Sequence, residues 1–368
     1  MVELKGCGYT QIKDKHGEKT DTMAEVRSNR MRSIFLCILL LFLFFNLSIA
    51  QNTTVGSMEQ IGTSMANFLK IGVGAREVAM GGAAVADCDN VASLFWNPGA
   101  LDRMEKSEII FQQTQWLVDT ELYFLGAGVK LPAFGSIGVS INYFTSGDIE
   151  ETTLTIPEGT GRTFTTYDMA LGLTYSRNIT ERFSAGITIK YIQEELDLEK
   201  ASTIAIDIGS VFETNFLNNL KIGMSLSNLG GRMKLTGSGL QVQYSPNPGY
   251  PTKITTANLT TEEWDIPLCF RLGIASDVIT NDNLRWRLVG EVMDSRDYIY
   301  RISLGSELAF LERYFLRGGY KFLYDEENFT LGAGFNLDLS WAQIRLDYAY
   351  ASFGIFNNAQ RFSLIFAF

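Results

Sequence analysis

The chain has 368 residues, of which 46% are hydrophobic and 20% are charged, and its formal net charge is −10. Without the first 50 residues, which carry seven Lys and Arg and five Asp and Glu, the net charge becomes −12. A net charge of −12 argues against nucleic acid and anionic lipid headgroups as partners, because both carry negative charge themselves.

The first 50 residues are predicted to be a leader that is removed. Residues 1–30 are polar, and an unbroken run of 12 apolar residues follows from Ile34 to Phe45. A membrane-spanning helix needs about 20 apolar residues, so this shorter run fits the core of a secretory signal peptide. An uncleaved membrane anchor is the alternative. Because the polar part is long for a signal, translation is expected to start at Met23 or Met31.

Loss of the leader also removes His16, the only histidine of the chain. Without histidine, a Ser–His–Asp triad, a Cys–His pair and a His-ligated metal site are all excluded. No carboxylate or Ser–Lys spacing indicates another chemistry, so we expect no enzyme activity, no metal and no cofactor. Cys88 and Cys269 remain after cleavage, and two separate buried thiols are favoured over one disulfide.

Residues 51–107 precede the first predicted strand and are rich in small residues. A short amphipathic helix is expected around residues 64–70. Two glycines permit close approach of the backbone, and three successive turn formers are expected to make a fixed reversal into the first strand. These residues are Gly81, Gly82, Asn97, Pro98 and Gly99.

From Glu108 to the end, the sequence shows strand-like alternation with no helix of useful length between the strands. A tilted strand of about ten residues crosses a membrane. The fourteen predicted strands are 108–116, 121–131, 134–145, 164–176, 182–192, 202–213, 220–229, 266–275, 284–293, 299–308, 314–323, 328–337, 340–350 and 360–368.

The two faces of these strands differ in chemistry. In residues 164–176, one face carries Leu171, Leu173 and Tyr175, while the other carries Thr, Gly and Asp168. An apolar face bounded by tyrosines suits lipid, and a polar face suits a lumen. A soluble β-sandwich also alternates, but its strands are usually shorter, about 5–6 residues.

The connections give an independent indication. Those after even-numbered strands are short, and the longest ones, at 146–163, 193–201 and 230–265, follow odd-numbered strands. Outer-membrane barrels have short periplasmic turns and long extracellular loops, so both chain ends are placed in the periplasm. The sequence therefore predicts an all-β, antiparallel transmembrane barrel of about 14 strands. Residues 51–107 are expected to plug its periplasmic mouth, or else to pack beneath it as an arm.

The last residues, RFSLIFAF, form a strand whose outer face is aromatic at Phe362, Phe366 and Phe368. Such a strand closes the sheet, so that no edge remains unpaired in lipid. It also resembles the terminal sequence that outer-membrane proteins present for assembly. The alternative is a hydrophobic terminal strand without that role.

Charges on the predicted inner face gather on strands eight to thirteen. We interpret them as braces between the wall and the plug, with a polar path or an anionic-headgroup site as the alternative. An apolar conduit is disfavoured by this wall. The residues are Arg271, Arg285, Arg287, Glu291, Arg301, Glu307, Arg317, Lys321, Arg345 and Asp347.

Residues 68–101, FLKIGVGAREVAMGGAAVADCDNVASLFWNPGAL, are similar to the N-terminal signature of the PorV/PorQ family. That family is related to the FadL long-chain fatty-acid transporters, in which a comparable piece forms the plug. The resemblance implies an outer-membrane protein without enzyme activity that handles exported cargo in type IX secretion or surface attachment. A FadL-like channel for hydrophobic small molecules is the alternative.

The expected partners are outer-membrane lipid and either secreted cargo proteins or hydrophobic small molecules. For cargo, the acidic 230–265 loop is the predicted recognition surface, because binding residues often lie on loops held by a rigid scaffold. Its aromatic residues are Tyr244, Tyr250 and Trp264.

Overall fold

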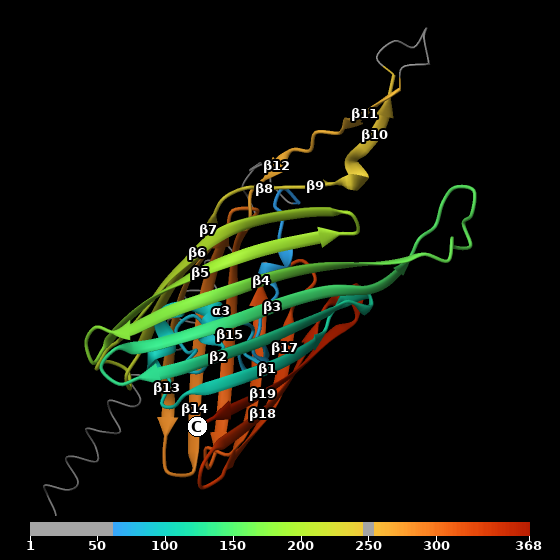
Figure 1. Cartoon of the computed structure of the whole chain (residues 1–368). Coiled ribbons are helices and arrows are strands. Elements are labelled where there is room, and N and C mark those ends of the chain that lie inside the picture. The colour runs from blue at the N-terminus through green and yellow to red at the C-terminus, as the bar shows by residue number, and fades with distance from the viewer. Residues whose placement is uncertain (1–61, 246–253) are drawn as a thin grey trace, which may run out of the picture. The chain divides into compact units, whose positions relative to one another are not determined.

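The computed structural model describes residues 62–245 and 254–368. Fourteen long strands in these residues form one antiparallel sheet that closes on itself (Figure 1). The first strand pairs with the last, with Glu108 opposite Ala367, and the β5–β6 pair completes the circle. Because a closed sheet has no unpaired edge, this wall can stand in lipid. The predicted fourteen-stranded barrel is confirmed, whereas the predicted leader lies outside the described residues.

The wall strands follow each other around the barrel in chain order. They are β1 (Glu108–Gln115), β2 (Glu121–Leu131), β3 (Gly135–Glu150), β4 (Thr163–Asn178), β5 (Phe183–Leu196), β6 (Glu199–Glu213), β7 (Lys221–Gly230), β13 (Cys269–Thr280), β14 (Leu284–Ser295), β15 (Tyr298–Phe310), β16 (Tyr314–Phe322), β17 (Phe329–Asp338), β18 (Gln343–Ser352) and β19 (Asn358–Ala367).

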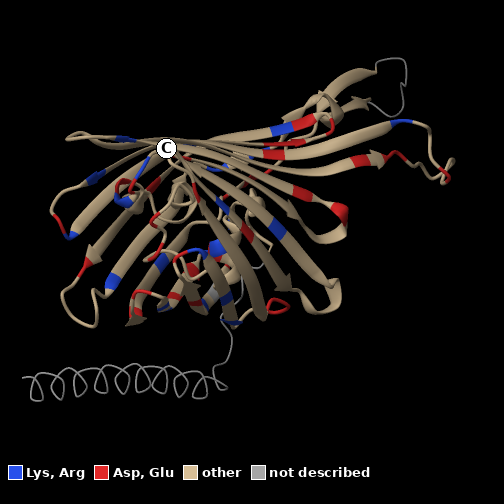
Figure 2. Cartoon of the chain, turned by 90° about the horizontal axis from the view of Figure 1, so that it is seen from below, with Lys and Arg blue, Asp and Glu red and all other residues tan. Residues whose placement is uncertain are grey.

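The outer face of the wall is apolar. Leu173 on β4 and Leu331 on β17, for example, are 56% and 54% exposed in the isolated chain. Figure 2 shows charged positions along the strands and near their ends, and several of the charges on the strands, such as Glu307 and Arg317, are buried. This segregation follows from the period-2 alternation, which sends successive side chains to opposite faces. No helix in the described part of the chain is long and apolar enough to cross a membrane.

The connections distinguish the two ends of the barrel. We call the end that carries the long connections 151–162 and 231–268 the loop end, and the opposite end, with connections such as 132–134 and 311–313, the turn end. By the usual layout of outer-membrane barrels, the turn end is expected to face the periplasm. One predicted loop, 193–201, is wrong: β5 and β6 continue as a hairpin, and only residues 197–198 connect them.

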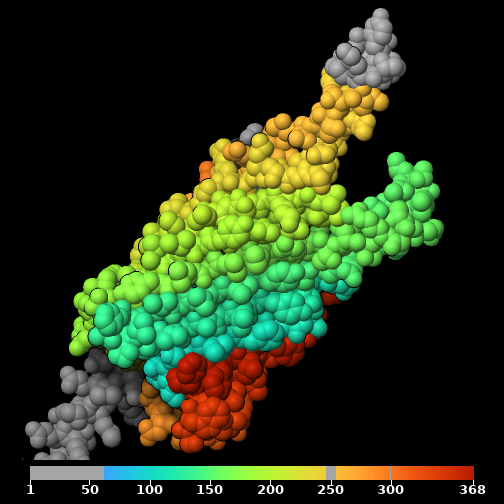
Figure 3. Space-filling model, in the orientation of Figure 1, coloured from blue at the N-terminus to red at the C-terminus, as the bar shows by residue number. Residues whose placement is uncertain are grey.

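Two extensions project beyond the loop end (Figure 3). The first is the β3–β4 pair, which continues to the connection 151–162. The second comprises residues 231–268. Its elements are β8 (Met233–Lys234), β9 (Thr236–Gly237), η4 (Ser238–Leu240), β10 (Gln241–Tyr244), β11 (Thr255–Asn258) and β12 (Glu263–Trp264). We call these the β3–β4 extension and the β7–β13 extension.

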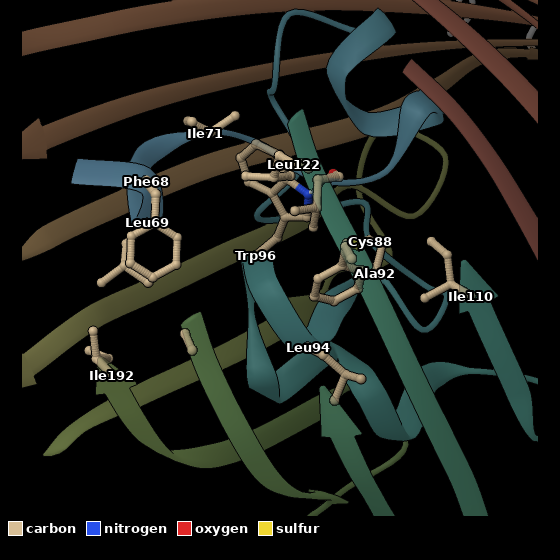
Figure 4. Packing of buried hydrophobic residues seen from close by; sticks show 14 of the residues in the cluster. Phe68, Leu69, Ile71, Cys88, Ala92, Leu94, Trp96, Ile110, Leu122 and Ile192 are labelled. Atoms are coloured by element: carbon tan, nitrogen blue, oxygen red, sulfur yellow. Dashed lines mark hydrogen bonds between the residues drawn. The ribbon is translucent and has the colours of Figure 1, made fainter. Parts of the chain in front are cut away.

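Residues 62–107, here the N-terminal segment, pack inside the wall. The expected helix at 64–70 is a single 3₁₀ turn, and two short α-helices follow it. The elements are η1 (Asn67–Lys70), α2 (Ala75–Ala79), α3 (Ser93–Trp96) and η2 (Pro98–Arg103). The largest apolar core joins this segment to β1, β2 and β5 through Trp96, Ile110, Leu122 and Ile192 (Figure 4).

Candidate functional site

The N-terminal segment runs through the lumen from the loop end to the turn end. At the loop end, the Ser64 hydroxyl donates to Asp297 at 2.7 Å, and Lys70 pairs with Asp297 at 2.6 Å. At the turn end, Asp102 accepts hydrogen bonds from Ser136 and from the backbone of Asn178, both at 2.7 Å. The expectation of a plug at one mouth of the barrel is therefore corrected, because the segment contacts the wall at both ends.

The pKa of Asp297, in the connection between β14 and β15, shows how firmly the loop-end contact is held. Burial acts to raise this pKa, but hydrogen bonds from Lys70, Ser295 and Ser64 outweigh it and lower the pKa to about 2. The Asp297 carboxylate is therefore ionised at neutral pH, and its ion pair with Lys70 is present there.

The predicted turn formers Asn97, Pro98 and Gly99 lie at the start of η2, the last element of the N-terminal segment. Asn97 does not make a reversal into β1: its side-chain oxygen accepts from Gly99 N–H at 3.0 Å and caps η2, which begins at Pro98. Its amide also donates to the carbonyls of Val85, at 2.7 Å, and Ser210, at 3.0 Å. Asn is favoured at such a cap because its side chain satisfies a free helical N–H.

Gly81 and Gly82 also adopt a special geometry. Their φ angles are 74° and 75°, in the region that favours glycine. The Gly81 N–H donates to Thr330 of β17 at 3.0 Å. Gly82 lies against the ring of Trp96.

Glycines of the wall face the N-terminal segment from opposite sides of the lumen. A Cβ at Gly209 would overlap Asn97, one at Gly223 would overlap the Val85 carbonyl, and one at Gly319 would overlap the backbone at Gly81. These strands bring backbone against backbone, which only glycine allows. The segment therefore fits closely against this wall.

A buried ion network fixes the middle of the N-terminal segment to one side of the barrel. Arg76, 4% exposed, pairs with Asp87 at 2.7 Å and with Glu307 of β15 at 3.1 Å. Asp87 also pairs with Arg287 of β14 at 2.7 Å and lies 3.6 Å from Lys221 of β7. Buried charges are tolerated when they are paired, so these contacts restrain the segment and the wall together.

Glu307 is the centre of the wall side of this network. Its carboxylate pairs with Arg317 at 2.7 Å and with Arg285 at 3.1 Å, in addition to Arg76. Arg317 in turn pairs with Asp347 of β18 at 2.6 Å. Three guanidinium groups thus share the Glu307 carboxylate, and each has a further acidic partner.

Two further predicted charges contact the N-terminal segment nearer the loop end. Glu291 accepts the backbone N–H groups of residues 84 and 85, both at 2.9 Å. Arg271 lies 3.5 Å from Glu291 and over the ring of Trp96, 5.4 Å from its centroid.

Among the described residues, Arg287 and Glu307 are the two predicted charges that form ion pairs with the N-terminal segment. Three others lie outside both this network and the Glu291 contacts. Arg301 lies over the rings of Tyr298 and Tyr324, and Lys321 pairs with Glu327. Arg345 lines a cavity at the turn end.

The N-terminal segment separates two cavities. The turn-end cavity, of about 420 Å³, is lined almost entirely by charged residues such as Arg76, Arg103 and Glu312. The loop-end cavity, of about 560 Å³, has a mixed lining of aromatic and charged residues, including Phe68 and Trp116. None of the described residues lines both cavities.

Several residues of this site were not predicted from sequence. Arg76, Glu77 and Asp87 belong to the quoted motif but were not singled out, although charges inside a small-residue, apolar stretch are a usable signal. Asn90 donates to Glu77 at 2.8 Å. Arg361 was treated only as part of the terminal strand, yet it is buried in the lumen.

The remaining predicted residues lie apart from the lumen. Phe362 and Phe368 are exposed on the outer face, and Phe366 packs 5.8 Å from the Trp341 ring. Tyr244 and Trp264 are exposed on the β7–β13 extension, whereas Tyr250 lies outside the described residues.

The cysteine expectation of two separate thiols is confirmed, since Cys88 and Cys269 are both free and buried. Within residues 62–245 and 254–368, no group of three or more His, Cys, Asp or Glu side chains is placed to hold a metal ion.

A closed antiparallel wall with an apolar outer face and a polar, filled lumen defines an outer-membrane β-barrel. A family model described as "Type IX secretion system protein PorV" matches residues 55–295, so the chain belongs to the PorV family.

Solved structures share the fold. The CymD monoaromatic hydrocarbon channel is 13% identical, with a TM-score of 0.50, covering 82% of this chain and 98% of its own. The Pseudomonas putida toluene transporter TodX is 12% identical, with a TM-score of 0.50 and coverages of 80% and 97%. The comparison with curated proteins found no match.

Proposed function

We propose that this protein handles exported proteins at the outer membrane, as a non-enzymatic component of a type IX secretion system. The proposal rests on the contrast between a lumen that is filled and two extensions that are free. The lumen is filled by the N-terminal segment, which buried ion pairs and close backbone contacts hold in place. The two extensions, by contrast, stand free beyond the loop end. Membership of the PorV family supports the same function.

The chemistry of the lumen argues against passage of hydrophobic molecules along the whole axis. Such molecules bind in pockets that are mostly apolar. Here the turn-end cavity is lined by charged side chains, among them Arg285, Arg287 and Glu307. An apolar solute would have to displace the N-terminal segment and then cross this charged region.

The extensions offer apolar side chains to a partner. Leu154 and Ile156 are exposed on the β3–β4 extension, and Val242, Tyr244 and Trp264 are exposed on the β7–β13 extension. Exposed apolar and aromatic groups on strands held by a rigid scaffold are suited to contact with protein. The proposed recognition surface is therefore at the loop end.

A channel for hydrophobic small molecules is the second candidate. One feature favours it: the loop-end cavity has aromatic lining from Phe68, Trp96 and Trp116. The fold shared with CymD and TodX is compatible with this function but, at such low identity, does not distinguish it from protein handling.

Loop and lumen variants in one strain distinguish the two functions. Tyr244→Ala is expected to reduce the amount of exported protein cross-linked to the barrel, while Gln243→Ala, its neighbour on the other face of β10, serves as the matched control. Replacing residues 236–261 with a short Gly-Ser linker should have the larger effect. Membrane levels should stay unchanged, because exposed loops contribute little to wall stability.

The lumen variant is Gly81→Val, which disturbs the backbone of the N-terminal segment. Protein handling predicts normal toluene uptake in the loop variants and impaired cargo capture. If cargo capture is intact in the loop variants while Gly81→Val alters toluene uptake, the channel function is correct and our proposal is wrong.

A further inference from the structure

A polar pocket lies on the outside of the barrel at the loop end, next to the base of the β7–β13 extension. Its volume of about 540 Å³ lies within the range of about 300–1,000 Å³ that small-molecule sites occupy. Side chains of β5 and β6 line it from the wall, and side chains of the extension line it from the other side. The two sides are joined because β9 pairs with the loop-end part of β6 (Figure 1).

The alternation of buried and exposed residues places the wall side chains of this pocket outside the lumen. Ile192 of β5 is fully buried in the inner core, so the neighbouring Tyr191 faces outward. Ala201 of β6 is buried in the same core, so Lys200 and Ser202 face outward as well.

The extension continues this outer surface. Met233 of β8 is buried in the same core, and its neighbours Arg232 and Lys234 line the pocket. Thr236 of β9 and Glu263 of β12 line it too. A ligand therefore reaches the pocket from outside the barrel, without entering the lumen.

The pocket begins where the apolar outer face of the wall ends. Tyr191 lies opposite Ile204 in the β5–β6 register, and the next outward pair toward the loop end is Gln193 with Ser202. On the other side of Tyr191 the outward residues are apolar, such as Ile189, which is 53% exposed. Because aromatic residues mark the interfaces of outer-membrane barrels, the headgroup layer of the membrane lies beside this pocket.

The charge of the lining differs from the charge of the whole chain. Lys200, Arg232 and Lys234 line the pocket together with one carboxylate, Glu263. Lys234 lies opposite Glu263 in the β8–β12 pair, but in the described part of the chain it forms no ion pair. Although the chain is acidic, this pocket offers cations to an anionic group.

Two exposed ion pairs border the pocket. Lys200 pairs with Glu195 at 2.8 Å, and Arg232 pairs with Asp265 at 3.1 Å. The side chains of these two cations are 59% and 60% exposed. Exposed ion pairs contribute little to stability, so both cations can turn from these carboxylates to a phosphate at little cost.

We propose that this pocket binds the phosphorylated sugar headgroup of a glycolipid in the membrane leaflet at the loop end, which is expected to be the outer leaflet. The phosphate accepts charge-assisted hydrogen bonds from Lys200, Arg232 and Lys234. The sugar hydroxyls bond to Ser202 and Glu263, and the acyl chains lie on the apolar outer face of β5 and β6. A phosphoethanolamine group is too small to fill the pocket. This inference does not depend on the proposed function.

Titration of three lipids into the full-length protein in detergent, followed by native mass spectrometry, tests the proposal. The lipids are diphosphoryl lipid A, the same lipid A without its phosphates, and phosphatidylglycerol, which has a phosphate but no sugar. Diphosphoryl lipid A is expected to bind about fivefold more tightly than either of the others, because only it offers both groups. Equal affinities would show non-specific contact with the wall and overturn the proposal. Tighter binding of phosphatidylglycerol would contradict the sugar headgroup.

The variant Lys234→Gln removes one cation without breaking an ion pair, so the fold is expected to be preserved. It should weaken binding of diphosphoryl lipid A about fivefold and leave the lipid without phosphates unaffected. Lys234→Arg retains the charge and should restore binding. Lys106→Gln, at an exposed lysine of the turn end, is the matched control and should change neither affinity. Unchanged binding in Lys234→Gln, or an equal loss in Lys106→Gln, would contradict the assignment of this pocket.

Discussion

The two halves of the barrel wall hold the same N-terminal segment by different physical means. Strands β13 to β18 present charged side chains, and Glu307, Arg287 and Arg317 join the segment in a buried ion network. Strands β1 to β6 present small and apolar side chains, against which Leu94, Trp96 and Leu101 are buried.

The two kinds of contact have different effects: one stabilises the segment, and the other determines its position along the wall. Apolar packing stabilises in proportion to the area buried, without strong directional preference. Buried ion pairs are costly to desolvate and contribute little net stability, but an unpaired partner is heavily penalised. We infer that the charged half determines the register of the segment, and that the apolar half supplies most of the stabilisation.

The largest effect is expected at the centre of the charged half. Glu307→Leu leaves Arg76, Arg285 and Arg317 without their shared carboxylate. Breaking a buried pair costs about 3–5 kcal/mol, so the free energy of unfolding in urea should fall by that amount.

Glu312→Gln is the control for this prediction. Glu312 pairs with Arg285 at the exposed end of the same network, where ion pairs contribute little. Equal losses of stability for Glu307→Leu and Glu312→Gln would show that burial of an ion pair does not determine its contribution to the free energy of unfolding.

A truncation tests the apolar half. Leu101 is fully buried beside Gly128 and Gly138. Leu101→Ala should lower the free energy of unfolding by about 2–4 kcal/mol, since a cavity remains. Leu154→Ala, on the exposed β3–β4 extension, should have no measurable effect. If Leu101→Ala is neutral, the apolar half does not stabilise the segment.

A third variant extends the comparison from the inner to the outer face of the wall. Phe366→Asp places a carboxylate toward lipid and should cost about 1–3 kcal/mol, depending on depth. The amount of folded barrel in the outer membrane should fall, as judged by migration of unheated samples. Phe366→Leu preserves the apolar face and should behave normally; a normal level of Phe366→Asp would argue against an assembly role of the terminal strand.

The smallest effect on stability is expected from single cysteine substitutions that report which end of the barrel faces outward. Thr63→Cys lies at the loop end, so a membrane-impermeant maleimide should label it on intact cells. Lys106→Cys, exposed at the turn end, should be labelled only after permeabilisation. The native Cys88 and Cys269 are buried and should not be labelled. The reverse labelling pattern would invert the assigned orientation.

The wall was predictable from sequence because each strand carries its own period-2 signal, as in residues 164–176. The path of the N-terminal segment was not, since it depends on contacts between residues far apart in the chain. Arg76 meets Glu307 across 231 positions, and no local pattern specifies that pair. The inner charges on β13–β18 were locatable by alternation, but their partners were not. The Arg361 environment was missed because its strand was interpreted through its outer, aromatic face.

The passage of residues 62–107 through the closed wall has a consequence for how the protein is made. The seam between β1 and β19 joins the two ends of the strand sequence. Once that seam forms, the ring encircles a stretch of its own chain, and Arg76 and Asp87 can no longer reach the inner wall from the side. After closure, the segment could reach β13–β18 only along the barrel axis, through one end of the barrel. We therefore infer that the segment is placed against β13–β18 before β19 pairs with β1.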